Sequence, residues 1–196
     1  MVSKPSQPEQ VPARSKRADA LRNQKTLLAA AAAVFITSGV DAPIREIAAR
    51  AGVGMGTIYR NYPTRAELVI AVYRHQIEAL VDASGDLQHS ASSPFEALRL
   101  WVDRFVDFLV TKHGLADIMQ PNSGHEALHS FFLDWLVPAC ENLLDAAEAS
   151  GEIKPGIEGY ELMRGIGNLC VGRDDSPLYD PRRMIELLLQ GLRHQR

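Results

Sequence analysis

His125, Glu126 and His129 have the spacing of the zinc protease pattern, in which two histidines one helical turn apart bind the metal and the glutamate activates water. Such a site also needs a third protein ligand and an open cleft. No second motif accompanies the three residues, and an apolar aromatic helix continues directly from them. We interpret the pattern as chance and expect no catalysis, no bound metal and no cofactor. A helical metal-dependent hydrolase is the alternative from another class.

The stretch 43–62 has the pattern of two short helices joined by a tight turn. Two short helical patterns meet at Gly52, which suits a left-handed turn conformation that other residues resist. Ala48 is small enough for the second helix to cross close above it. A small core can be formed by Ile47, Val53, Ile58 and Tyr62. This layout predicts a helix-turn-helix, whose second helix presents its outward side chains to the major groove of DNA.

The outward side chains of this predicted motif are hydrogen-bond donors suited to phosphates and base edges. They are Arg45, Thr57, Tyr59, Arg60 and Asn61, and Arg65 follows at the start of the next helix. Gly54 and Gly56 leave no side chain between the backbone and DNA, so the second helix can approach closely.

Charge is distributed unevenly along the 196 residues, whose net charge is −3. Residues 1–74 carry 11 Lys and Arg against 5 Asp and Glu, whereas residues 75–196 carry 10 against 19. The excess of basic residues in 1–74 and of acidic residues in 75–196 indicates that the N-terminal part binds a polyanion. Chance surface charge is the alternative interpretation.

Composition excludes several classes of protein. The apolar content of 46% is ordinary for a globular chain. No apolar run reaches the roughly 20 residues that span a bilayer, and the N-terminus lacks an apolar signal segment. We therefore expect a cytoplasmic protein without a membrane partner. Cys140 and Cys170 have no metal-ligand spacing, and we expect buried, reduced thiols.

Hydrophobic periodicity predicts an all-α fold of about nine helices. The predicted helices lie at residues 18–38, 43–51, 54–62, 64–83, from Pro94 onward, one turn at 114–119, 125–150, 158–172 and 181–194. Residues 1–17 are polar and read as a flexible arm. The expected domains are a three-helix DNA-binding domain at 18–63 and a helical domain for ligand binding and dimerisation at 64–196.

Five large aromatic residues lie on two neighbouring predicted helices of the second domain. They are Trp101, Phe105, Phe108, Phe131 and Trp135. Such stripes usually form core, but five exceed what a narrow seam needs. We expect them to form core and also to line a pocket for a small, apolar molecule.

The last two predicted helices are apolar over wide arcs. The residues are Met163, Ile166, Cys170, Ile185, Leu188, Leu189 and Leu192. A wide arc needs two partners, and Gly165 and Gly167 would let a partner helix approach. We therefore predict that these helices form a four-helix bundle with a second copy of the chain.

Residues 18–75 resemble the DNA-binding domain of the TetR family of bacterial transcription regulators. The matching residues are Ala30-Ala31, Phe35, Gly39, the stretches 45–48, 51–54 and 56–63, and Arg65-Ala66-Glu67-Leu68. In that family the rest of the chain is a helical ligand-binding and dimerisation domain.

The resemblance implies roles for individual residues. Tyr59 and Arg65 would contact phosphates, while Thr57 and the backbone near Gly56 would fix the recognition helix on the sugar-phosphate backbone. Arg45 and Met55 occupy positions that reach bases. Arg60 and Asn61 are open to either role. The basic residues Arg14, Lys16 and Arg17 of the arm lie over the adjacent DNA or form a solvated tail.

The resemblance and the residues together predict a homodimeric repressor that binds a near-palindromic double-stranded operator. A small-molecule effector would shift the dimer toward a state with the wrong spacing between recognition helices. An activator of the same fold, or a regulator that answers to a protein partner, is the nearer alternative.

Overall fold

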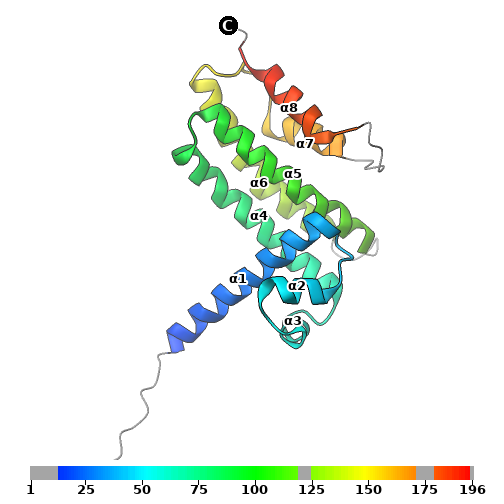
Figure 1. Ribbon diagram of the computed structural model, residues 1–196. Helices are drawn as coiled ribbons and strands as arrows, with labels where there is room; N and C mark the ends of the chain where they lie inside the picture. Colours follow the sequence, from blue (N-terminus) through cyan, green and yellow to red (C-terminus); the bar gives the residue numbers. More distant parts are fainter. Residues whose placement is uncertain (1–12, 119–124, 171–178, 195–196) are drawn as a thin grey trace, which may run out of the picture.

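The computed structural model describes residues 13–118, 125–170 and 179–194, and within them it contains eight α-helices and no strand element (Figure 1). In chain order the helices are α1 (Ala13–Ser38), α2 (Ile44–Ala51), α3 (Met55–Asn61), α4 (Arg65–Ser90), α5 (Pro94–Ile118), α6 (His125–Ala149), α7 (Gly159–Cys170) and α8 (Pro181–Leu192). The predicted all-α class is confirmed. No described helix is long and apolar enough to cross a bilayer.

The sequence predicts about nine helices, and the described residues contain eight. Residues 114–118 of the expected separate turn are the end of α5, which runs without a break to Ile118, and residue 119 lies outside the described residues. The helix α4 extends to Ser90 rather than to about Ala83, because Ser84 and Leu87 continue its buried face. Gly85 lies inside this extension, and packing along the buried face offsets the roughly 1 kcal/mol that a glycine inside a helix costs.

The predicted arm is also too long at its C-terminal end. Helix α1 begins at Ala13, so residues 13–17 are helical, whereas residues 1–12 lie outside the described part of the chain. Ala, Arg and Lys in this segment are good helix formers, which explains why the helix extends into it. Residues 18–26 of α1 are exposed, and this half of the helix projects away from the rest of the molecule (Figure 1).

Two bundles share helix α4. The small bundle contains α1, α2, α3 and the first turns of α4, and the larger one contains the rest of α4 with α5 to α8 (Figure 1). One continuous core joins them, since Phe35, Ile47, Ile58 and Leu68 of the small bundle belong to the same buried cluster as Tyr73 further along α4. Helix α4 therefore connects the two bundles through one packed core.

Hydrogen bonds from buried aromatic side chains fix α4 against its neighbours. The Trp101 indole Nε1 donates to the Leu80 carbonyl at 2.9 Å, and the Tyr73 hydroxyl donates to the Leu128 carbonyl at 3.2 Å. Burial raises the pKa of Tyr73, so the hydroxyl keeps its proton and remains a donor. Both polar groups are thereby satisfied inside the core.

Helices α7 and α8 pack on the outside of α5 and α6. Arg182 at the start of α8 forms ion pairs with Asp103 and Asp107 of α5. Cys140 and Cys170 are buried and not disulfide-bonded, which confirms the prediction for both. Burial raises the pKa of the Cys140 thiol to about 12, so it stays protonated near neutral pH.

Candidate nucleic-acid interface and effector cavity

The turn between α2 and α3 has the geometry that the glycine predicts. Gly52 adopts φ 66° and ψ 29°, the left-handed conformation, and ends α2. The Val53 N–H then donates to the Ala48 carbonyl at 3.1 Å, which satisfies a carbonyl of the last turn. The first turn of α3 is closed by the Thr57 N–H, which donates to the Gly54 carbonyl at 2.9 Å. These two hydrogen bonds close the turn between the helices.

The predicted small core of the motif is confirmed. Ile47, Ile58 and Tyr62 are buried, and Val53 packs partly buried against the same cluster. The amide of Gln24 on α1 donates to the Tyr62 hydroxyl at 3.1 Å and ties the end of α3 to α1. The orientation of α3 is therefore set by its packed side and by this hydrogen bond to α1.

The opposite side of α3 faces solvent. Of the nine residues predicted to contact DNA, seven are exposed, namely Arg45, Gly54, Met55, Gly56, Tyr59, Arg60 and Asn61. Met55 and Tyr59 keep 51% and 52% of their surface exposed, which is unusual for large apolar or aromatic side chains. A Cβ added at Gly54 or Gly56 would meet no atom within 4 Å. Packing within the chain therefore does not explain either glycine.

Three polar side chains near α3 are already engaged within the chain. Arg60 donates to the Gly56 carbonyl at 3.1 Å and to the Thr57 hydroxyl at 3.3 Å, and the Asn61 amide donates to the Thr57 carbonyl at 2.8 Å. The half-buried Arg65 donates to the carbonyls of Val40 and Ala42, the latter at 2.9 Å.

The guanidinium of Arg65 thus closes the loop between α1 and α2. This contact holds α2 in place and is a structural role that the sequence did not indicate. Arg45 and Tyr59, by contrast, are exposed, and no hydrogen bond of their side chains is found among the described residues.

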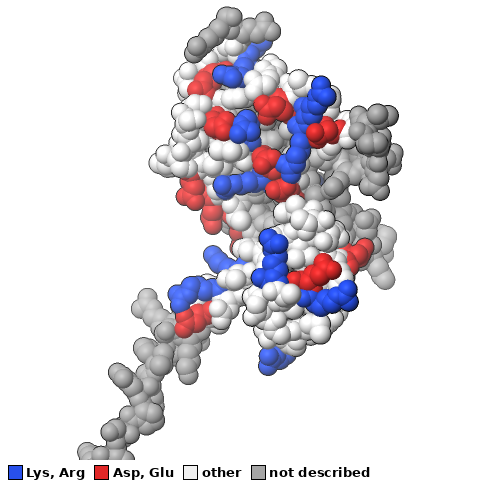
Figure 2. All heavy atoms as spheres, in the orientation of Figure 1, with Lys and Arg blue, Asp and Glu red and all other residues white. Residues whose placement is uncertain are grey.

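The basic residues on the described surface agree with a basic N-terminal part of the chain. Arg22 and Lys25 lie on α1, Arg45 and Arg50 on α2, and Arg60 on α3. Figure 2 shows basic atoms along α1 and at the outer tip of the helix-turn-helix, with some acidic atoms beside them, and the larger bundle carries both signs. An anionic partner is favoured at this end of the molecule.

The zinc protease pattern lies at the start of α6. The side chains of His125 and Glu126 lie outside the described residues. His129 is exposed, and its ring stacks on Phe132 with centroids 5.9 Å apart. Among the side chains that the structure does describe, no three His, Cys, Asp or Glu residues are grouped as a metal site.

The five aromatic residues predicted to line an effector pocket are divided between the core and the outer side of α6. Trp101 and Phe105 stack in the core, with ring centroids 5.5 Å apart, and Phe108 is also buried. Phe131 and Trp135 pair with each other on the outer side of α6, and Trp135 is 47% exposed. A single pocket lined by all five residues stays a prediction.

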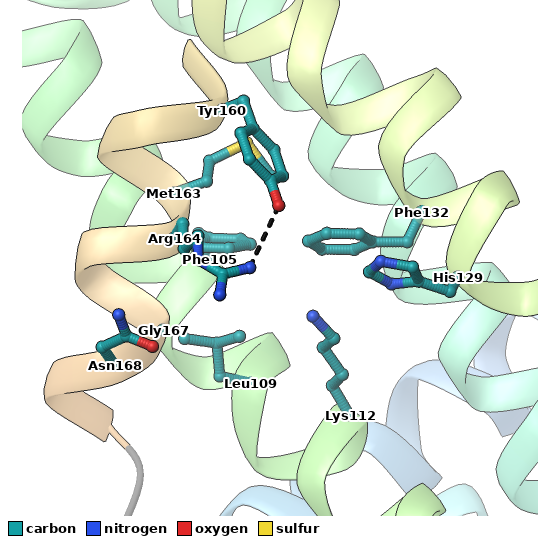
Figure 3. A pocket seen from close by; sticks show the side chains of 10 residues that line it. All are labelled: Phe105, Leu109, Lys112, His129, Phe132, Tyr160, Met163, Arg164, Gly167 and Asn168. Carbon is teal, nitrogen blue, oxygen red and sulfur yellow. Dashed lines mark hydrogen bonds between the residues drawn. The ribbon is translucent and has the colours of Figure 1, made fainter. Parts of the chain in front are cut away.

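A cavity of about 200 Å³ opens between α5, α6 and α7 (Figure 3). Its lining is Phe105, Leu109 and Lys112 from α5, His129 and Phe132 from α6, and Tyr160, Met163, Arg164, Gly167 and Asn168 from α7. Only Phe105 belongs to the predicted set. The basic and hydroxyl groups were missed because nothing in the local periodicity of α7 shows which of its residues face α5.

The residues of the predicted dimer interface lie largely in the core of one chain. Met163, Ile166, Cys170, Ile185 and Leu189 are all buried within the chain, while Leu188 and Leu192 are partly buried. The inner arcs of α7 and α8 therefore complete the core of one copy, and their contact with a second copy stays a prediction. On α8 a separate arc faces solvent wholly or in part. It contains Met184, Leu187, Leu188 and Gly191, which recur at helical spacing.

These features define an all-α protein with a helix-turn-helix at one end and a cavity-bearing helical bundle at the other. Residues 27–72 match the family described as bacterial regulatory proteins, tetR family, and residues 93–194 match the C-terminal domain of SbtR-like transcriptional regulators. The chain belongs to the TetR family of bacterial transcription regulators.

Two solved structures cover nearly the whole chain. A TetR transcriptional regulator from Streptomyces coelicolor is 36% identical with a TM-score of 0.68, covering 88% of this chain and 99% of its own. A TetR transcription regulatory protein from Mycobacterium vanbaalenii is 30% identical with a TM-score of 0.64, covering 91% of this chain and 99% of its own.

Similarity to curated proteins is shorter. The transcriptional activator FasR from Mycolicibacterium smegmatis is 33% identical over 84 residues, which are 42% of this chain and 38% of FasR. A transcriptional regulator from Staphylococcus aureus is 24% identical over 95 residues, or 48% of this chain and 51% of that protein. The chain thus spans about half or less of these two relatives.

Proposed function

We propose that this protein is a homodimeric regulator that binds a near-palindromic DNA operator through α3 and that a small molecule changes its affinity for the operator. The exposed face of α3 carries the proposal. It presents Tyr59 and Met55 to solvent beside two glycines that have open space above them. A surface of this kind fits the major groove, where close backbone approach and exposed donors are needed.

Arg45 and Tyr59 make two different kinds of contact with DNA in this proposal. Arg45 at the start of α2 is proposed to read a base edge, and the Tyr59 hydroxyl is proposed to donate to a phosphate. Thr57, Asn61 and Arg60 contact the sugar-phosphate backbone in this proposal. Arg65 acts indirectly, by holding the loop before α2.

The test of these roles compares operator with random DNA. Arg45→Ala is expected to weaken operator binding about 10- to 100-fold with little change on random DNA, because one base contact is lost. Tyr59→Phe is expected to weaken binding to both DNAs by a similar factor, because a phosphate contact carries no sequence information. Fluorescence anisotropy with both DNAs gives the ratio of operator affinity to random-DNA affinity for each variant. Equal losses for Arg45→Ala on operator and random DNA would contradict its base-reading role.

Dimerisation is proposed to use the outer arc of α8. Leu187 is 58% exposed and Met184 is 40% exposed, and both lie on the same side of the helix as Leu188 and Gly191. Two copies of this arc related by a two-fold axis would bury these side chains against each other. The same axis would place the two α3 helices on successive half-sites of the operator.

Leu187→Asp is therefore expected to convert the dimer to a monomer, because a carboxylate would be desolvated at the centre of the interface. Sedimentation equilibrium measures the change. Gln190→Asp is the matched control, since it adds the same charge to the polar side of α8. A Leu187→Asp protein that remains dimeric would show that another surface forms the dimer.

The cavity between α5, α6 and α7 is proposed as the effector site. A chain of ring contacts connects it to α4. Phe132 stacks on Phe108 with centroids 5.9 Å apart, and Phe108 packs on Tyr73 of α4 at 5.3 Å. A ligand that displaces Phe132 would shift α4 and with it the helix-turn-helix, because packed cores respond by discrete rearrangement.

Repression is the favoured outcome of operator binding, with release by the effector. Activation is the second candidate, since FasR is named an activator. A reporter gene placed behind the selected operator distinguishes the two. Higher expression after deletion of the regulator indicates repression, and lower expression indicates activation. Family membership supports a regulator rather than an enzyme, and a regulator of chromosomal DNA acts in the cytoplasm.

A further inference from the structure

The cavity between α5, α6 and α7 combines an apolar floor with basic groups that converge on it. Phe105, Phe132 and Leu109 form the apolar part. Figure 3 shows the ammonium of Lys112 and the guanidinium of Arg164 pointing toward the middle of the cavity from opposite helices. This arrangement differs from the mostly aromatic lining with few polar contacts that the sequence predicts.

Lys112 is a cation whose charge is not compensated by a carboxylate among the described residues. Its side chain is half-buried, and burial lowers its pKa below the usual value. The ammonium lies 3.9 Å from the centre of the Phe132 ring. Within the described part of the chain no carboxylate forms an ion pair with it. A cation–π contact offsets only part of the cost of removing an ammonium from water.

Arg164 brings a second positive charge to the same space. Its guanidinium accepts no hydrogen bond and donates one to the Tyr160 hydroxyl at 3.1 Å. No carboxylate among the described residues pairs with it. The Tyr160 hydroxyl, whose oxygen accepts this bond, still has its own proton to donate. Two cations and one hydroxyl donor thus face one opening, which is the donor set that a carboxylate accepts from.

The volume limits the rest of the ligand. A cavity of about 200 Å³ is below the range of about 300–1,000 Å³ typical of drug-sized ligands and above the roughly 150 Å³ that holds benzene. The space fits one aromatic ring or a short alkyl chain beside the charged group.

We propose that the cavity binds a small monocarboxylate, with its carboxylate between Lys112, Arg164 and Tyr160 and its apolar body against Phe105 and Phe132. The ligand class rests on the cavity alone, whereas its effect on DNA rests on the proposed function. Binding supplies the negative charge that the cavity lacks and covers the aromatic floor. An uncharged molecule of the same shape supplies only the second of these contributions.

The test uses Trp101 as the reporter in the full-length protein. The chain has two tryptophans, and a Trp135→Phe background removes the exposed one. Trp101 then reports on the cavity because it stacks on Phe105. Benzoate and hexanoate are titrated against benzamide and hexanamide, the neutral counterparts, and against inorganic phosphate. Calorimetry of the same pairs gives a readout that does not depend on fluorescence.

One or both carboxylates are expected to bind at least about tenfold more tightly than their amides and than phosphate. Lys112→Met and Arg164→Met are each expected to weaken carboxylate binding about tenfold and to leave amide binding unchanged. Lys154→Met and Arg183→Met are the matched controls, because both residues are exposed and lie outside the cavity lining. Lys112→Met is also expected to melt no lower than the parent protein, since it removes a desolvated charge.

Four results would overturn the proposal: amides that bind as tightly as carboxylates, cavity variants that retain carboxylate affinity, no binding of either carboxylate, or phosphate that binds as tightly as the carboxylates. The last result would show an anion site without an apolar part. Because DNA is absent, none of these results bears on operator binding. A bound carboxylate that leaves operator affinity unchanged would refute only the effector role.

Discussion

Gly56→Glu is expected to lower operator affinity by at least about a hundredfold while leaving the protein folded. The Cβ of a side chain at position 56 enters open space, so nothing within the chain resists the change. In the proposed complex the same space is taken by DNA. A carboxylate there would displace α3 from the groove and repel phosphates, which removes several contacts worth about 1–3 kcal/mol each.

Gly85→Glu is the matched control for this substitution. Gly85 lies inside α4, is exposed, and has no atom within 4 Å of an added Cβ. Both variants exchange a helical glycine for a better helix former, and both should be stabilised by up to about 1 kcal/mol. Anisotropy titrations with operator DNA then distinguish the two variants, because only Gly56→Glu is expected to lose operator affinity. Operator affinity that is equal for Gly56→Glu and the parent protein would place the DNA on another surface.

Gly159→Ala is expected to destabilise the protein by about 2 kcal/mol, although it adds a single methyl group. Gly159 begins α7 where that helix approaches α6. An added Cβ would lie 2.7 Å from the Glu141 Cγ and 3.1 Å from both the Glu141 nitrogen and the Val137 carbonyl oxygen. Two of these atoms belong to the backbone, so α7 must move away from α6. Thermal melting should show a decrease of about 4–8 °C.

Gly165→Ala in the same helix provides the comparison. Its added Cβ would meet nothing within 4 Å, and alanine favours the helix by about 0.5–1 kcal/mol. Its melting temperature should therefore equal or exceed that of the parent when both are measured at one protein concentration. If both variants melt alike, close contact between α6 and α7 is not what requires the glycine at 159.

The helix-turn-helix could be predicted from sequence because its determinants are local. One left-handed glycine, one small residue at the crossing and four inward apolar residues lie within 20 positions, and each is required by backbone geometry. The capping box that starts α4 is local in the same way, and both of its hydrogen bonds between Thr64 and Glu67 are present. The hidden role of Arg65 was not predictable, since its partners lie more than 20 positions earlier in the chain.

The cavity proposed as the effector site could not be predicted because three helices form it. Aromatic spacing along α6 indicates an apolar face but does not show that Phe132 faces the core while Trp135 faces solvent. The arcs of α7 and α8 posed the same difficulty. Their apolar residues are predicted to face both their own domain and a second copy of the chain, and in the structure α5 and α6 of the same chain cover most of them. Periodicity gives the direction of an apolar face and does not identify the partner that covers it.

The most direct measurement is a selection of genomic fragments by the purified protein, including DNA upstream of its own gene, followed by a salt titration on the selected site. We expect a near-palindromic site bound by a dimer, with an affinity that falls steeply as salt increases, because several phosphates are neutralised in each half-site. The site would also identify the regulated gene. A protein that prefers no fragment over bulk DNA would contradict sequence-specific binding through α3.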